Sequence, residues 1–381
     1  MSTIASPTDI LRRAHAVGNY YGFSSLASLS SKKKGTKTKG AHPESINLDK
    51  LDPAARDVAG LLKQMRDNGI APSTLSPVFL WHTNIAPGRT SPKGIVVQFH
   101  AFGVDHAIAD AVLIRAVRSF IGDITKHEPR LRLNSMGDKE TRSRFARELT
   151  TFFRKNGPIL PADCVTCART DVFEAAERLT KCEGLECDIP SPTDHLSEAS
   201  RKHFEGVLEY LEATDTPYEL APDILSRGMS WSETCFEILT DASIQAWGSR
   251  YTELSKHFFK NSFSSVGAVI HIATEERSAV VAPKETKHPR FVFVHIGEEA
   301  KRESMKMADQ LRHARIPMTQ AIGIESLTEQ MRFADNLNPP YLLIMGRKEA
   351  LERSVILRER STHTETFIPL DSLIDRLRAV V

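Results

Sequence analysis

Long apolar runs are absent from this sequence. No segment approaches the roughly eighteen consecutive apolar residues that a membrane-spanning helix requires. The N-terminus also lacks the pairing of positive charge with an apolar stretch that marks a secretory signal. These absences argue against the membrane and secreted classes, and they predict a protein of the cytoplasm. No internal repeat is evident, so nothing indicates a repeat architecture.

Net charge is nearly absent as well. The 381 residues contain 50 lysines and arginines against 48 aspartates and glutamates. A neutral total does not exclude a nucleic-acid partner, because a local basic patch binds phosphates without a basic whole. The length is enough for two or three domains and a sizeable hydrophobic core.

Cysteine is scarce, with five residues in the chain. This number argues against a disulfide framework and indicates reduced thiols or a metal. Four of the cysteines form two pairs, which are Cys164 with Cys167 and Cys182 with Cys187. Zinc takes four soft ligands in a tetrahedron, and closely spaced thiolates from two turns supply them. The pattern therefore predicts a structural zinc site, and the alternative is four unligated thiols in a small helical insertion.

The last part of the chain alternates predicted strands and helices. An apolar run at 341–345 ends in Gly346, a short charged segment follows, and an alternating run begins at Ser354. This pattern predicts strand, turn and strand, with the second strand half buried or at a sheet edge. The alternation predicts a partly parallel sheet covered on both faces. Further strands are expected at 291–296, 317–322 and 364–369, and helices at 298–314, 326–336 and 370–380.

The preceding part predicts a second, larger unit. Two strands, at 78–83 and 95–102, are separated by a loop rich in proline and glycine, which is typical of a hairpin. A lysine-rich loop at 30–40 is either a solvated, mobile loop or a nonspecific contact to an RNA backbone. Further strands are expected from 131, from 218 and at 265–272, and helices at 8–21, 54–68, 107–121, 141–153 and 195–211.

Residues 325–335, 344–346 and 355–358 carry a family resemblance. Together with the strand–helix pattern around them, they resemble the anticodon-binding domain of class II aminoacyl-tRNA synthetases, most closely that of the histidyl enzyme. The resemblance implies that this domain binds tRNA. It also implies that the helix from Ser326 faces the anticodon, with Gln330 and Arg332 as tRNA-binding residues.

The resemblance extends to the first unit. The pair Tyr21-Gly22 stands where the class II dimer motif begins, which implies a homodimer. The predicted hairpin is similar to the second class II motif, whose loop arginine neutralises the α-phosphate of ATP, and Arg89 is the candidate for this role. Residues 99–105 resemble the histidyl pattern F-H-Q-x-G-x-E, with Ala101 in place of the glutamine. Asp105 replaces the glutamate, and it is either an amino-acid ligand or a strand-end carboxylate in water.

Three further segments resemble the histidyl enzyme. Residues 227–237 are similar to R-G-L-D-Y-Y-x-x-T-V-F-E, one residue shorter. This match implies that Arg227 contacts carboxylate and phosphate. Trp231 stands at a tyrosine of the histidine pocket, with a purely structural role as the alternative. Residues 247–254 resemble G-G-R-Y-D-x-L and add Arg250 and Tyr251 as substrate-binding candidates. Gly267 matches a glycine of the third class II motif and is a further substrate-binding candidate. The arginine of that motif, which normally contacts ATP, is replaced by Thr274, and Arg277 stands three residues late.

The sequence thus predicts two domains. Residues 1–285 are expected to form an α+β, class II synthetase-like antiparallel sheet with a helical, cysteine-containing insertion at about 140–215. Residues 286–381 are expected to form an α/β anticodon-binding domain. One implied function is histidine–tRNA ligation, in which ATP with Mg²⁺ activates histidine for transfer to tRNA. The other is that of a non-catalytic paralogue that binds tRNA or a partner enzyme.

Overall fold

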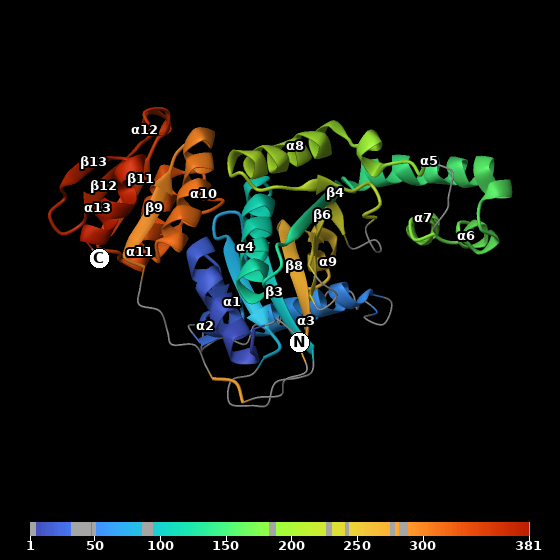
Figure 1. The fold of residues 1–381 in the computed structure, drawn as a ribbon, viewed down its shortest axis with the longest axis horizontal. Helices are drawn as coiled ribbons and strands as arrows, with labels where there is room; N and C mark the ends of the chain where they lie inside the picture. Colours follow the sequence, from blue (N-terminus) through green and yellow to red (C-terminus); the bar gives the residue numbers. More distant parts are fainter. Residues whose placement is uncertain are drawn as a thin grey trace.

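The computed structural model of the chain contains two β-sheets, each with its own helices (Figure 1). It describes residues 5–31, 47, 51–85, 94–182, 188–225, 231–240, 244–274, 279–281 and 289–380. Within these residues the first sheet has eight strands in the order β1-β2-β3-β8-β7-β6-β4-β5, and the second has five in the order β10-β9-β11-β12-β13. The predicted domain boundary between residues 285 and 286 lies outside the described residues.

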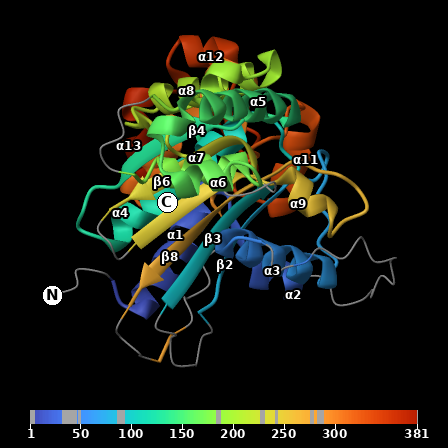
Figure 2. The same ribbon diagram turned by 90° about the vertical axis from the view of Figure 1, so that its right-hand side faces the viewer.

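The first sheet is antiparallel except at its two margins, where β1 pairs with β2 and β4 pairs with β5 in parallel. This confirms the predicted antiparallel sheet. Figure 2 shows strands β2, β3 and β8, which are neighbours in this order, running side by side. The strands are β1 (Ser24–Ser25), β2 (Val78–Thr83), β3 (Gly94–Phe102), β4 (Arg130–Ser135), β5 (Glu219–Leu220), β6 (Ser232–Leu239), β7 (Ile244–Arg250) and β8 (Ser265–Ala273).

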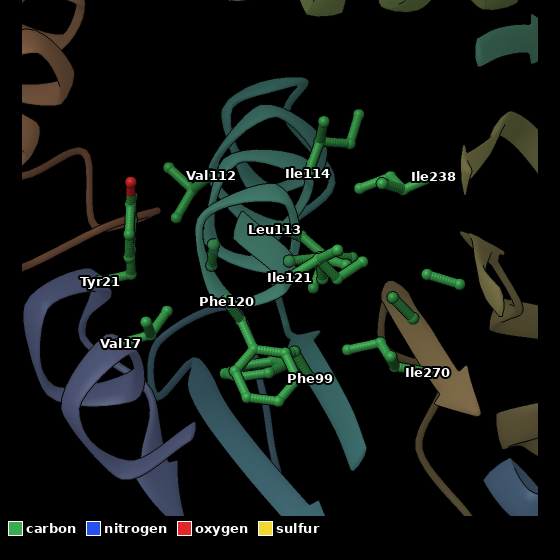
Figure 3. Packing of buried hydrophobic residues seen from close by; sticks show 14 of the residues in the cluster. Val17, Tyr21, Phe99, Val112, Leu113, Ile114, Phe120, Ile121, Ile238 and Ile270 are labelled. Atoms are coloured by element: carbon green, nitrogen blue, oxygen red, sulfur yellow. The ribbon is translucent and has the colours of Figure 1, made fainter. Parts of the chain in front are cut away.

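One face of this sheet is covered by three long helices, α1 (Pro7–Tyr21), α4 (Ile108–Ile124) and α8 (Glu198–Ala213). Helix α4 is apolar nearly all round, which is typical of a helix buried on every side. Figure 3 shows Phe120 of α4 lying against Phe99 of β3, in the same cluster as Val17 of α1. This cluster is the main hydrophobic core of the chain.

The opposite face is covered by α3 (Pro53–Asp67) and the short α9 (Thr252–Lys256). The buried side of α3 carries Val58, Leu61, Leu62 and Met65, which pack on residues of β2, β3 and β8. Its first turn is capped by Asp52, whose carboxylate accepts a hydrogen bond of 2.9 Å from the Ala55 N–H. We call this side the α3-covered face. A short α2 (Leu26–Ser31) follows β1.

The expected helical insertion extends away from the sheet as α5 (Lys139–Asn156), α6 (Ala162–Cys167) and α7 (Val172–Leu179) (Figure 1). It has a small core of its own, to which Phe145, Leu149 and Leu179 contribute. A 3-10 turn, η3 (Pro192–His195), leads from the insertion into α8. Among the described residues, none of the helices has the length and apolarity required to span a bilayer.

The C-terminal domain confirms the predicted mixed sheet. Strands β10, β9 and β11 are parallel, and β12 and β13 continue the sheet antiparallel. Helices α10 and α13 cover one face and α11 the other. The elements are β9 (Phe291–His295), α10 (Glu298–His313), β10 (Met318–Gln320), α11 (Leu327–Leu337), β11 (Tyr341–Met345), α12 (Arg347–Leu351), β12 (Ser354–Glu359), β13 (Glu365–Pro369) and α13 (Leu373–Ala379).

The two domains are joined through α10, which lies beside α1 and α4 (Figure 1). Arg115 of α4, only 4% exposed, donates to the carbonyl oxygen of Met305 at 2.8 Å and also to the carboxylate of Asp309. The hydroxyl of Tyr21 donates to the same carboxylate. Arg312 reaches back to Asp123 at 3.2 Å. Because a buried guanidinium needs its partners, this junction fixes the two domains against each other.

Candidate functional site

Three of the predicted substrate-binding residues lie together on the α3-covered face. Trp231 and Tyr251 pack with ring centroids 5.9 Å apart, and both are fully buried. The hydroxyl of Tyr251 is 2.6 Å from Nδ1 of His100 on β3. Gly267 pairs with His100 across the sheet. The sequence thus brings Trp231, Tyr251 and Gly267 to one place, around a histidine that the resemblance did not single out.

The hydrogen bonds of His100 define a neutral imidazole. Its Nε2 lies 3.0 Å from Oε1 of Gln98, which is an acceptor, so Nε2 carries the proton. Nδ1 then accepts from the Tyr251 hydroxyl. Burial, with a smaller contribution from His82, lowers the pKa of His100 to about 3. The ring therefore stays uncharged at neutral pH and serves as a fixed hydrogen-bonding element of the core.

Gly267 has a steric reason to be glycine. A Cβ atom at this position would overlap the imidazole ring of His100. The third-motif glycine thus provides the space that the His100 ring fills.

We expect Gly267→Ala to destabilise the fold by about 1–3 kcal/mol, because the added methyl group overpacks a closed interior. The midpoint of urea unfolding measures the change. Gly60→Ala in α3 is the matched control, since no atom lies within 4 Å of the Cβ position there. The control is expected to gain stability slightly, as glycine-to-alanine changes in helices do. Equal midpoints for the two variants would show that the His100 ring moves aside freely.

Trp231 connects the sheet to the helix above it. Its indole N–H donates to Oδ2 of Asp52 at 2.9 Å, and Asp52 is also the cap of α3. Its ring packs edge-on against Trp247, with centroids 4.2 Å apart. Trp231, Tyr251 and His100 are at most 1% exposed. The chain's own side chains therefore occupy this part of the face, and α3 closes over them.

Arg250, a further substrate-binding candidate, points to the opposite face, between the sheet and α4. Its guanidinium donates to Asp110 from Nε at 3.1 Å and from a terminal nitrogen at 2.5 Å. It also donates to the carbonyl oxygens of Val104 and His106, both at 3.1 Å. Every guanidinium nitrogen is thus engaged within the protein. The arrangement is a buried ion pair that joins β7 to α4.

Asp110 carries the negative charge of this pair. Burial by itself would raise the pKa of its carboxyl, but Arg250 and His203 outweigh burial and lower the pKa to about 2. His203 of α8 lies 3.2 Å from the same carboxylate. The charged form of Asp110 is therefore favoured in the folded protein.

The predicted catalytic arginines are not placed by the structure. Arg227 and Arg89, and also Arg277, lie outside the described residues. Asp105 follows the end of β3 and is exposed to solvent, away from the buried cluster around His100.

Three of the four described cysteines, Cys164, Cys167 and Cys182, lie in the core of the insertion, and the fourth, Cys235, lies on β6. Cys164 is buried, and Cys167 and Cys182 are partly buried. Within the described residues no three histidine, cysteine, aspartate or glutamate side chains are grouped closely enough to bind a metal. Cys187 lies outside the described residues. The four-thiolate zinc site stays a prediction, which the zinc content of protein purified without chelator decides.

The two predicted tRNA-binding residues differ in their surroundings. Gln330 is buried, accepts from the His295 N–H at 2.9 Å and donates to the His295 carbonyl oxygen at 2.7 Å. It thereby fixes α11 on β9. Arg332 is 65% exposed and bonded to Glu329 at 2.7 Å. Of these two residues, Arg332 is the one that reaches solvent and could contact a ligand there, whereas the amide of Gln330 is bonded inside the domain.

Sequence reasoning missed His100 and Asp110 as central residues, although signals for both exist. Residues 96–102 alternate in β3, so that Gln98 and His100 share the face of Phe102. Asp110 is a single carboxylate in the first turns of an apolar helix, where a buried charge needs a partner. The partner, Arg250, is 140 residues away in sequence.

Comparison with known proteins gives consistent results. The sequence profile of the family described as "Anticodon binding domain" matches residues 278–380. The chain is 28% identical to the histidine–tRNA ligase of Geobacillus sp. (strain WCH70), covering 84% of this chain and 83% of the relative. It is 27% identical to that of Acetivibrio thermocellus, covering 84% and 80%. The solved apo histidyl-tRNA synthetase of S. aureus aligns with a TM-score of 0.47 at 20% identity, covering 97% of this chain and 94% of that one.

Proposed function

This chain is a divergent member of the histidyl-tRNA synthetase family, and we propose that it binds tRNA through its C-terminal domain without synthesising histidyl adenylate. In this proposal tRNA is the ligand, whereas ATP, Mg²⁺ and histidine are not. The protein works in the cytoplasm as a homodimer that forms through the segment around Tyr21 and Gly22.

The packing of the α3-covered face carries the proposal. In the family pattern, the positions of Trp231, Tyr251 and Gly267 belong to the substrate site. In this chain Tyr251 is hydrogen-bonded to His100, and Trp231 is hydrogen-bonded to Asp52. The imidazole ring of His100 fills the space beside Gly267. A site for histidine and ATP at these positions requires open volume with charged groups along its walls. The residues present there are buried, and the imidazole among them is neutral.

The C-terminal domain supports RNA binding. Its match to anticodon-binding domains covers residues 278–380, and Arg332 on α11 has an exposed guanidinium. Its ion pair with Glu329 is exposed, and exposed pairs of this kind contribute little stability. A phosphate group therefore replaces Glu329 as the partner of Arg332 at small cost.

We expect Arg332→Glu to weaken binding of tRNA by about tenfold near 0.1 M salt, because one phosphate contact becomes a repulsion. Filter binding over a series of salt concentrations measures both the affinity and its salt dependence. The control is Arg12→Glu in α1. Arg12 has the same 65% exposure and is likewise bonded to a carboxylate three residues earlier, Asp9. Equal affinity of the two variants for tRNA would count against an RNA-binding role of α11.

A further inference from the structure

Three arginines gather where the first domain meets α10. Arg13 of α1 donates to the main-chain carbonyl oxygen of Asp123, in the last turn of α4. Arg312 of α10 donates to the carboxylate of the same Asp123 at 3.2 and 3.3 Å. Arg315 follows just beyond the end of α10. We call Arg13, Arg312 and Arg315 the junction arginines, and Figure 1 shows α1 and α10 side by side.

Tyr20 shows that Arg315 lies near the other two. Burial raises the pKa of Tyr20, and the nearby positive charges of Arg312 and Arg315 oppose this rise. Tyr20 stands about two helical turns after Arg13 in α1, so Arg13 and Tyr20 share one face of that helix. This face of α1 is therefore directed toward the C-terminal end of α10 in the same chain.

The junction arginines carry more positive charge than their surroundings balance. Among the described residues, the carboxylate that pairs with them is that of Asp123, through Arg312. Arg13 and Arg315 have no carboxylate partner within this part of the chain. Asp309, one turn before Arg312, is already bonded to α1 and α4. Because like charges repel and a partly buried guanidinium without a counter-ion is costly, the cluster favours an added anion.

The same guanidiniums have unused donors. Arg13 and Arg312 each bond to Asp123 through Nη1, and their Nε atoms have no hydrogen-bond partner within the described residues. Arg315 is exposed and the side chain of Arg312 is 17% exposed, so the cluster is open to solvent on one side. A guanidinium is a planar fork of N–H groups that matches the oxygens of a phosphate. A phosphate thus supplies both the negative charge and the acceptors that this cluster lacks.

We propose that the junction arginines bind a phosphate group, carried either by a small phosphorylated molecule or by the backbone of an RNA. The phosphate contacts α1 and α10 together and so adds to the bonds that hold the two domains. The proposal does not rest on RNA binding by α11, because α10 and α11 cover opposite faces of the second sheet.

The test is isothermal titration calorimetry of inorganic phosphate into the full chain, at an ionic strength held constant with potassium chloride. The deciding variant is Arg315→Gln. Arg315 is exposed and has no bonded side-chain partner within the described residues, so the change leaves the packing of the junction intact. We expect the dissociation constant for phosphate to rise about tenfold, because a charge-assisted contact is lost.

Arg12→Gln is the matched control. Arg12 precedes Arg13 on α1, is 65% exposed and is paired with Asp9, so its loss is expected to leave phosphate binding unchanged. Absence of saturable phosphate binding, or equal binding by the two variants, would overturn the proposal. Filter binding of tRNA to the same variants then identifies the source of the phosphate. Weaker tRNA binding by Arg315→Gln than by Arg12→Gln assigns the site to an RNA backbone, and equal tRNA binding assigns it to a small phosphorylated molecule.

Discussion

Histidine-dependent exchange of pyrophosphate into ATP is expected to run at no more than the background rate. Adenylate formation builds negative charge at the α-phosphate, and preorganised cations must stabilise it. In the family pattern these cations are one arginine of the second class II motif, one of the third class II motif and one of the segment specific to the histidyl enzyme. This sequence keeps only the last of them, as Arg227. The loss of one such group costs on the order of a hundredfold to a thousandfold in rate. The loss of two such arginines, in a protein whose own side chains fill the α3-covered face, is expected to bring the rate to background.

The measurement is an exchange assay with radiolabelled pyrophosphate, in which the Geobacillus relative serves as the positive control. Arg89 and Arg277 are the two cations near the motif positions that are able to replace the missing arginines. Exchange at the rate of the relative, abolished by Arg227→Ala and by Arg89→Ala, would establish a relocated arginine site and an active ligase.

Replacement of Arg250 by methionine is expected to destabilise the fold by about 3–5 kcal/mol. The substitution leaves the buried carboxylate of Asp110 without its main partner, and breaking a buried pair on one side has this cost. Urea unfolding of the two variants measures the difference. Arg130→Met is the control, because Arg130 is 69% exposed and its pair with Glu219 lies at the sheet margin. We expect less than about 0.5 kcal/mol for that control.

The acid dependence of stability gives a second readout of the same pair. The pKa of Asp110 is lower in the folded protein than in the unfolded chain. Its contribution to stability is therefore present above the ordinary carboxyl pKa near 4 and is lost as the pH falls toward 2. In Arg250→Met this contribution shrinks, so the loss of stability between pH 4 and pH 2 becomes shallower. Unchanged stability at neutral pH together with an unchanged acid profile would contradict the structural role of the pair.

Local patterns in the sequence were sufficient for most of the fold. The strand predicted at 78–83 is β2 to the residue, because an apolar, β-branched and aromatic run ends at a loop of turn formers. The helix predicted at 298–314 is α10, which ends one residue earlier. The charged segment after Gly346 was wrongly predicted as a turn. It forms α12, where the Glu349 carboxylate accepts the Gly346 N–H at 2.9 Å and so caps a short helix.

The candidate site was less predictable because its contacts are distant in sequence. Motif similarity placed Trp231 and Tyr251 in one site, and they do lie together. It did not indicate that α3 closes over them, since this depends on a hydrogen bond from Trp231 to Asp52, 179 residues away. Arg250 shares a motif with Tyr251, yet the alternation of a strand directs the two side chains to opposite faces. The element that covers each face of the sheet is set by tertiary packing, and the spacing of residues in a motif does not predict it.

The junction at α10 has a consequence for how the chain is made on the ribosome. Asp309 is bonded to Tyr21 across 288 positions and to Arg115 across 194. During synthesis, the nearly buried guanidinium of Arg115 has neither Met305 nor Asp309 available until the C-terminal domain emerges. Domains usually fold one after another as they leave the ribosome. Here the first domain completes its packing only when the last quarter of the chain is present. A chain that stops early leaves the charged guanidinium of Arg115 on α4 without these partners.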